Sequence, residues 1–112
     1  MRLAYLAAPY RADTIHGVVS NIRKAEEDAI SLWQMGFAVL APQKNSALLD
    51  GLLPDDVWLE GALEMLSRCD LAVFAGEWRR SEGCLAEFGR AGELEIPRYD
   101  FIGDYLAIKE AV

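Results

Sequence analysis

Histidine and cysteine are scarce in this sequence: there is one histidine, His16, and there are two cysteines, Cys69 and Cys84. One histidine excludes a histidine-rich metal site, and the two cysteines have neither metal-ligand spacing nor a disulfide framework. We therefore expect reduced thiols, a cytoplasmic location and no bound metal. Because His16 lies far in the sequence from any candidate nucleophile, a Ser-His-Asp or Cys-His site is disfavoured.

Long apolar runs are also missing, since none approaches the roughly 18 residues that a membrane span needs. The start, MRLAYLAAPY, is apolar only briefly before Pro9 and Arg11, which predicts a first strand rather than a signal peptide.

Basic residues are few, with 11 Lys and Arg against 18 Asp and Glu and a net charge of −7. This balance disfavours binding to DNA or RNA, although a few local arginines suffice for a small anion.

The length of 112 residues and the hydrophobic fraction of 53% fit one compact domain with a real core, residues 1–112. Short apolar runs predict strands at 2–8, 37–42, 70–76 and 96–103. Amphipathic spacing and end signals predict helices at 16–36, 54–68, 82–93 and 104–112, with loops at 43–53 and 77–80. The alternation predicts an α/β fold, a doubly wound flavodoxin-like or Rossmann-like three-layer sandwich with a four- or five-stranded parallel sheet.

Ligands of such sheets bind at the carboxyl ends of the strands. Those ends fall within 7–11, 41–44 and 76–83 here. They carry our candidate binding residues, which are Ala7, Pro9, Tyr10, Arg11, Trp78, Arg79, Ser81 and Gly83. Tyr10 and Trp78, like Trp58 in the predicted helix 54–68, either stack on a base or pack in the core. The arginines either bind an anion or form solvated surface pairs.

Glu87 is unusual because it falls inside the apolar arc of its predicted helix, among Cys84, Phe88 and Ala91. Glu82 and Glu93 of that helix point toward water. Glu87 either reaches solvent and pairs with an arginine or is held in a pocket. A pocket carboxylate can attack an electrophilic sugar carbon or stabilise an oxocarbenium-like centre.

Two neighbouring features accompany Glu87. Ser81 and the first backbone N–H groups, including that of Gly83, begin the same helix, so a phosphate could bind there. Ser81 is equally well placed to be a simple helix cap. Tyr5, in the first strand, either packs in the core or points its hydroxyl toward Glu87.

At these residues the sequence resembles the nucleoside 2-deoxyribosyltransferase superfamily, in particular its short bacterial and phage members of unassigned function. The resemblance covers about residues 3–99 and is carried by YLAAPYR at 5–11, CDLAVFAGEW at 69–78 and SEGCLAEFGRA at 81–91. It implies a doubly wound parallel sheet, assembly into homodimers or larger oligomers, and chemistry at an N-glycosidic bond. The small-molecule substrate would be a nucleoside or nucleotide, and neither a metal nor an organic cofactor would be needed.

The resemblance also implies residue roles. Glu87 would be the nucleophile that takes the sugar, and Tyr5 would orient it or bind the sugar. Ser81 stands where transferases acting on free nucleosides usually carry aspartate and where nucleotide N-glycosidases, which hydrolyse 5′-monophosphates, carry serine. Together with Tyr10 and Arg11, it therefore favours a phosphorylated substrate.

One position departs from the family pattern. The family commonly has an aspartate eight residues before the one that matches Asp70, and this chain has Ala62 there. Asp55 lies on roughly the same helix face two turns earlier, and Asp56 is less well aligned. The alternative function, a non-catalytic nucleotide-binding or sensor module, rests mainly on Ala62.

Overall fold

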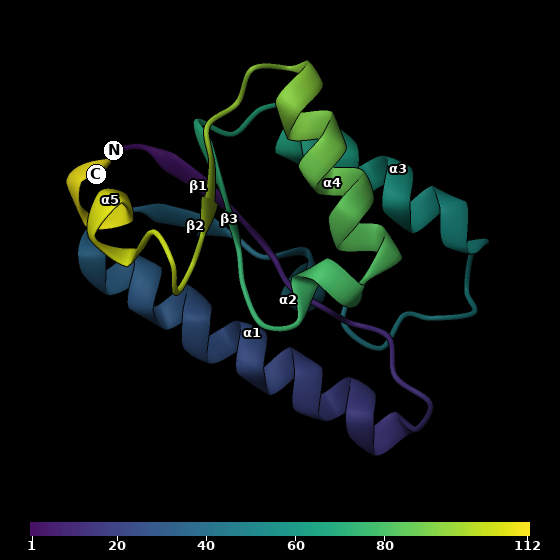
Figure 1. Cartoon of the computed structure of the whole chain (residues 1–112). Coiled ribbons are helices and arrows are strands. Elements are labelled where there is room, and N and C mark those ends of the chain that lie inside the picture. The colour runs from purple at the N-terminus through teal and green to yellow at the C-terminus, as the bar shows by residue number, and fades with distance from the viewer.

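A single parallel sheet organises the molecule. The computed structural model describes residues 1–112 and contains the strands β1 (Leu3–Ala7), β2 (Ala38–Leu40), β3 (Leu71–Phe74) and β4 (Arg98–Asp100). They lie in the order β2-β1-β3-β4, and every neighbouring pair is parallel. The predicted α/β class with a parallel sheet is confirmed, with four strands (Figure 1).

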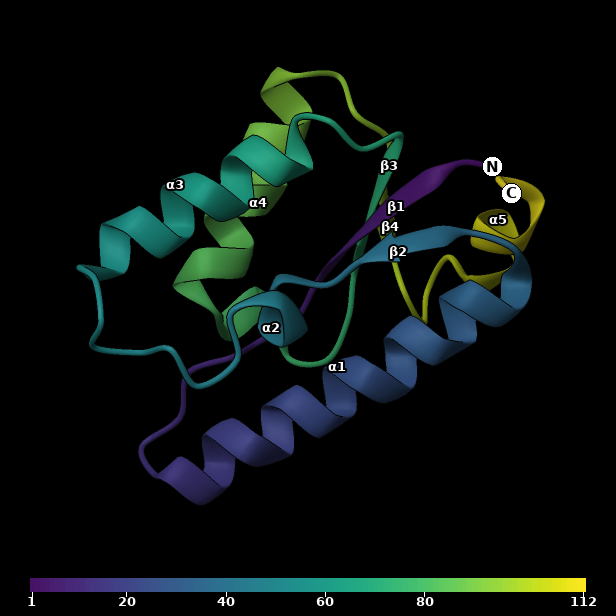
Figure 2. The ribbon, with the colours of Figure 1, turned by 180° about the vertical axis from the view of Figure 1, so that it is seen from behind.

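Helices cover both faces of the sheet. Helices α1 (Ile15–Met35) and α5 (Tyr105–Glu110) pack on one face, and α3 (Asp55–Leu66) and α4 (Glu82–Glu93) pack on the other. Figures 1 and 2 show the two helix layers from opposite sides. None of the helices combines the length and the apolar character needed to cross a membrane. The three-layer arrangement follows from amphipathic helices that bury their apolar stripes on a sheet.

The alternation of side chains along β1 determines which of them face helix α4. Ala4 and Leu6 point into the core beneath α1, whereas Tyr5 and Ala7 point into the core beneath α3 and α4. All four side chains are fully buried. The period of two along the strand therefore brings Tyr5 to the face that carries Glu87.

Helix α1 matches its prediction of 16–36 to within one residue. The Thr14 hydroxyl oxygen accepts a hydrogen bond from the backbone N–H of Gly17 at 2.9 Å, which caps the first turn. The helix ends at Gly36, whose φ of 113° lies in the left-handed region that side chains disfavour. Its buried residues recur at the predicted spacing: Ile22, Ala25, Ala29 and Leu32.

Two segments predicted as loops contain short helices. Helix α2 (Pro42–Asn45) begins at a proline, which fits the first helical turn because the missing N–H needs no partner there. A single 3₁₀ turn, η1 (Trp78–Arg80), precedes α4. The fourth strand is shorter than the predicted 96–103, because the Asp100 carboxylate accepts from the Gly103 N–H and turns the chain.

Candidate active site

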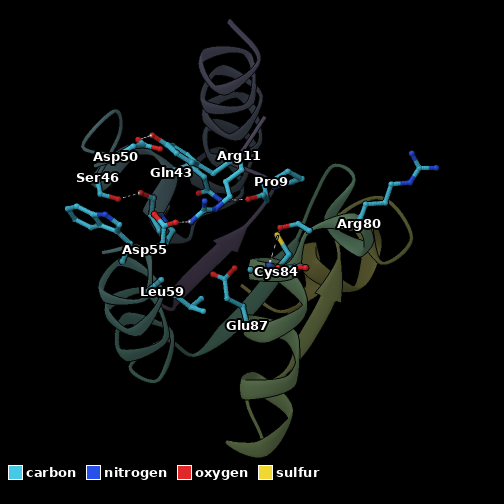
Figure 3. A pocket seen from close by; sticks show the side chains of 18 of the residues that line it. Pro9, Arg11, Gln43, Ser46, Asp50, Asp55, Leu59, Arg80, Cys84 and Glu87 are labelled. Atoms are coloured by element: carbon cyan, nitrogen blue, oxygen red, sulfur yellow. Dashed lines mark hydrogen bonds and ion pairs between the residues drawn. The ribbon is translucent and has the colours of Figure 1, made fainter. Parts of the chain in front are cut away.

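A cavity of about 790 Å³ opens at the carboxyl end of β1, between α3 and α4. Its walls come from the loop after β1, from α2 with the loop that follows, and from the first turns of α3 and α4. Figure 3 shows the hollow with Asp55 and Leu59 on one side and Cys84 and Glu87 on the other. This is the place where parallel sheets bind ligands, as the sequence predicts.

Glu87 is buried and faces the cavity. The residue as a whole is 8% exposed, and its carboxyl group points into the hollow (Figure 3). The Tyr5 hydroxyl donates a short hydrogen bond to its Oε2 atom. The two residues are 82 positions apart in sequence, and the strand and helix packing brings them together. One carboxylate oxygen is thus held by Tyr5, and the other is available to a ligand.

The surroundings shift the acid–base behaviour of this pair. Burial raises the pKa of Glu87 from 4.5 to about 7, and the hydrogen bond from Tyr5 opposes that rise. Burial and the neighbouring Glu87 charge raise the pKa of Tyr5 far above its usual value, so its hydroxyl stays protonated and donates. Glu87 therefore changes charge near neutral pH, where a nucleophile or base is most useful.

Cys84 also lines the cavity, but it is not a strong nucleophile. Burial raises the pKa of its thiol to about 12, although the hydrogen bond with Ser81 lowers it. The thiolate, which is the reactive form, is therefore scarce at neutral pH. No group of three His, Cys, Asp or Glu side chains is arranged to hold a metal ion. Among the cavity groups, Glu87 is the one prepared for nucleophilic chemistry.

The raised pKa predicts a pH-dependent stability change for Glu87→Gln. The folded protein keeps a proton on Glu87 that the unfolded chain, with a pKa of 4.5, releases. This contribution to stability is complete below the unfolded pKa and is lost as the pH rises through the folded pKa. We expect Glu87→Gln to raise the free energy of unfolding by about 2 to 3 kcal/mol at about pH 9 and to change it little at about pH 4.

Urea denaturation of both proteins at the two pH values measures this effect. Glu93→Gln is the matched control, because Glu93 lies on the same helix with its side chain 68% exposed. An equal change for Glu87→Gln at both pH values would show that burial does not disfavour the charged carboxylate.

Ser81 caps α4. Its Oγ accepts a hydrogen bond from the backbone N–H of Cys84 at 3.2 Å. Ser81 and Gly83 line the cavity, so the predicted helix start lies at the ligand end of the fold.

We expect Ser81→Ala to lower the free energy of unfolding by about 1 kcal/mol, as measured by urea denaturation. Ser81→Asp, which keeps a capping oxygen, should be nearly neutral.

Pro9, Tyr10 and Arg11 line the cavity as well, but the polar side chains of Tyr10 and Arg11 already have partners. The Tyr10 hydroxyl donates to Asp50 at 2.5 Å and accepts from the backbone N–H of Leu48 at 2.9 Å. Arg11 pairs with Asp55 at 3.0 Å. Both side chains therefore connect the loop after β1 to the segment that leads into α3.

Three of the candidate binding residues lie outside the cavity lining, and so does Tyr5, which reaches the cavity through Glu87. Trp78 is 5% exposed, stacks on Phe88 with a centroid separation of 5.0 Å, and donates from Nε1 to Asp100 at 2.9 Å. Arg79 lies over the Trp78 ring and reaches Asp100 at 3.7 Å. Ala7 is fully buried at the end of β1. Trp78 and Arg79 thus connect the segment before α4 to Asp100 at the end of β4.

The cavity also contains residues that were not singled out from the sequence. Gln43 is 6% exposed and donates from Nε2 to the Ala8 carbonyl at 2.8 Å, which ties α2 to the loop after β1. Leu59, in the first turns of α3, forms part of the wall together with Trp58, which the sequence suggests either for stacking on a base or for packing. The proline and acidic signals at the start of α3 predicted the helix but not which of its side chains face the cavity.

Ala62 lines the cavity and is 9% exposed. It therefore presents a methyl group at the position where the family commonly has an aspartate. Asp55 and Asp56 are also in the lining, one to two turns earlier on α3. The cavity keeps carboxylates on this wall, although none stands at position 62.

The chain shares its fold with solved structures. The chain is similar to a 2-deoxyribosyltransferase from Bacillus psychrosaccharolyticus, described as a biocatalyst for the synthesis of nucleosides, with 20% sequence identity and a TM-score of 0.63. That similarity covers 88% of this chain and 70% of the other. A conserved protein from Enterococcus faecalis V583 is similar over 89% of this chain and 62% of its own length, with 20% identity and a TM-score of 0.72.

These similarities confirm the fold that the resemblance to the nucleoside 2-deoxyribosyltransferase superfamily implies. No protein-family model and no curated protein matches the chain. Because fold does not fix function, the activity has to follow from the cavity.

Proposed function

We propose that this protein cleaves the N-glycosidic bond of a nucleoside or nucleoside 5′-monophosphate, with Glu87 as the nucleophile. The sugar then passes to water or to a second base. The observation that carries the proposal is the buried Glu87 carboxyl group, which faces a ligand-sized cavity and accepts a hydrogen bond from Tyr5. The fold shared with a 2-deoxyribosyltransferase supports the same chemistry.

The proposed reaction has two steps, and the first uses a carboxylate oxygen in the cavity. An ionised Glu87 oxygen attacks the anomeric carbon of the sugar and forms a glycosyl ester, while the carbon–nitrogen bond breaks. The base leaves with that electron pair and takes a proton from water. In the second step, water releases the sugar, which is hydrolysis, or a second base takes it, which is transfer. The carboxylate is regenerated in both cases.

Tyr5 positions the nucleophile throughout. Its hydroxyl holds one Glu87 oxygen, so the carboxylate plane keeps one orientation toward the cavity. The hydrogen bond also favours the ionised carboxylate, which is the reactive form. Since sugar, base and carboxylate carry the chemistry, we propose that neither a metal nor an organic cofactor takes part.

Ala62 supports a second candidate function. Without a carboxylate at that position, a chain of this fold could bind a nucleotide as a sensor and leave the bond intact. Buried titratable groups also occur in binding proteins, so Glu87 alone does not separate the two candidates.

A substrate panel distinguishes enzyme from binding module. The protein is incubated with purine and pyrimidine nucleosides and their 5′-monophosphates, with and without a second free base, and the products are separated by chromatography. Release of base supports the proposed activity, and exchange onto the added base identifies transfer rather than hydrolysis. Ligand binding without release from any compound would contradict the enzymatic function and favour the sensor.

We also propose that the protein acts in the cytoplasm as a homodimer or larger homo-oligomer. Ile102 and Leu106, near the C-terminus, are 84% and 74% exposed, which is unusual for large apolar side chains. Light scattering during gel filtration measures the assembly state, and a monomer at micromolar concentrations would contradict this part of the proposal.

A further inference from the structure

Two buried polar side-chain atoms of this protein have no hydrogen-bond partner, and both belong to residues that line the cavity. They are Oε1 of Gln43, which is an acceptor, and Nε1 of Trp58, which is a donor. Nearly all buried polar groups in proteins are paired, so each exception calls for an explanation, such as a role in catalysis. Packing or stacking of the Trp58 ring does not explain its unpaired N–H group.

Trp58 belongs to the wall that α3 contributes. The α3 residues in the cavity lining are Asp55, Asp56, Trp58, Leu59 and Ala62. Trp58 carries the one side-chain N–H group of this set. Asp55 and Asp56 are exposed, and Asp55 is already paired with Arg11. Leu59 and Ala62, next to Trp58 on the helix, are apolar, so a hydrogen bond formed there is strengthened by weak electrostatic screening.

The α3 wall lies across the hollow from the proposed nucleophile. Figure 3 shows Asp55 and Leu59 on one side and Glu87 on the other. When a carboxylate attacks the anomeric carbon, the leaving group departs from the opposite face of the sugar. A sugar presented to Glu87 therefore directs its base toward α3, which is where the unpaired N–H group of Trp58 is found.

We infer, on the basis of the proposed function, that the indole N–H of Trp58 donates a hydrogen bond to the base of the bound nucleoside and stabilises that base as it leaves. The acceptor is a carbonyl oxygen or an unprotonated ring nitrogen. As the carbon–nitrogen bond breaks, its electron pair passes to the base, and negative charge spreads onto these acceptor atoms. A donor placed against them binds the transition state more strongly than the ground state. The indole keeps its own proton, so the base still takes its proton from water.

The unliganded structure leaves Trp58 free for this contact. Its N–H is shielded from water, while the residue as a whole is partly exposed. The ring therefore has to turn its N–H toward the base, and no hydrogen bond within the protein is lost in that turn. Because an unpaired buried donor is destabilising, pairing it with the base is a net gain. The small side chain of Ala62, one turn later on the same helix face, limits crowding of the ring.

Trp58→Phe removes the N–H group and keeps an aromatic ring that can still stack or pack. We expect kcat for base release to fall by about 10- to 100-fold, because a hydrogen bond to a group that gains charge contributes strongly. KM should change by about threefold or less, since the bond to the neutral ground state is weaker. An unchanged kcat, or a loss confined to KM, would overturn the inference and leave Trp58 a stacking or packing residue.

Trp33→Phe is the matched control. Trp33 is 52% exposed on α1, which packs on the other face of the sheet, and it lies outside the cavity lining. The same chemical change there should leave both kcat and KM at their native values. A loss as large as that of Trp58→Phe would show that the activity responds to tryptophan replacement in general, which would also overturn the inference.

A hydrogen–nitrogen correlation spectrum reports the contact without any turnover. The chain has three tryptophans, and the two Trp→Phe variants assign their indole N–H signals. The Glu87→Gln protein is titrated with the common purine and pyrimidine nucleosides and their 5′-monophosphates. We expect the Trp58 signal to move to higher proton frequency, as an N–H does when it forms a hydrogen bond. The signals of Trp33 and of Trp78, whose Nε1 already donates to Asp100 at 2.9 Å, should stay in place.

The spectrum separates this inference from the proposed activity. A Trp58 shift to higher frequency supports the contact even if the native protein releases no base, in which case the enzymatic function alone fails. Base release by the native protein without that shift for any compound keeps the enzymatic function and overturns the inference. A Trp58 signal that stays in place or moves to lower frequency with every compound overturns the inference whether or not base is released.

Discussion

We expect Glu87→Gln to lower kcat/KM for base release by at least about a thousandfold. Glutamine keeps the size of the side chain and can still accept the hydrogen bond from Tyr5, so the cavity and the fold are preserved. The amide, however, has no negative charge with which to attack the sugar. In the proposed reaction Glu87 provides the first step, so its removal should leave only binding and positioning by the remaining cavity residues.

The loss is measured by chromatography of released base under single-substrate conditions. Glu93→Gln changes a carboxylate of the same helix that lies outside the cavity, so it should retain essentially full activity. If Glu87→Gln releases base at a rate within a few-fold of the native protein, the carboxylate does not act as the nucleophile.

We expect Tyr5→Phe to move the acidic limb of the pH–rate profile to higher pH. With Glu87 at a pKa of about 7, kcat/KM in the native protein should rise as the pH increases through neutrality, because only the ionised carboxylate attacks in the proposed reaction. The Tyr5 hydrogen bond lowers that pKa, and a bond to a charged group contributes about 1.5 to 3 kcal/mol. Its loss should move the midpoint of this limb up by about 1 to 2 pH units and reduce activity at pH 7 by roughly 5- to 50-fold.

The profile of kcat/KM against pH separates this effect from general damage. A structural defect lowers the curve at every pH, whereas loss of the hydrogen bond shifts its midpoint and leaves the value at high pH closer to the native one. Tyr99→Phe, on the opposite face of the sheet, is the control and should leave the midpoint unchanged. A midpoint that stays near pH 7 in Tyr5→Phe would show that Tyr5 does not lower the pKa of Glu87.

The main elements of the fold follow from local patterns in the sequence. Helix α1 shows a repeated apolar spacing and ends at a glycine with positive φ, so its extent is predicted to within one residue. The approach of Tyr5 to Glu87 follows from two periodicities: alternation along β1 and rotation along α4. Each periodicity gives one face, and the parallel α/β arrangement brings the two faces together.

The partners of surface polar groups do not follow from such patterns. Trp78 and Arg79 follow the end of a strand in the sequence, yet both side chains contact Asp100 on β4, which is 21 or more positions away. Arg11 likewise pairs with Asp55 across the entrance of the cavity. These contacts depend on how the loops pack in three dimensions, and no local signal in the sequence marks them.

The covalent intermediate gives the most direct test of the role of Glu87. The protein is mixed with a nucleoside that it cleaves, quenched with acid during turnover, digested, and analysed by mass spectrometry. We predict that one sugar unit is attached to the peptide containing Glu87 and is absent from the Glu87→Gln protein. Base release without any such adduct, or an adduct on a different residue, would contradict the account.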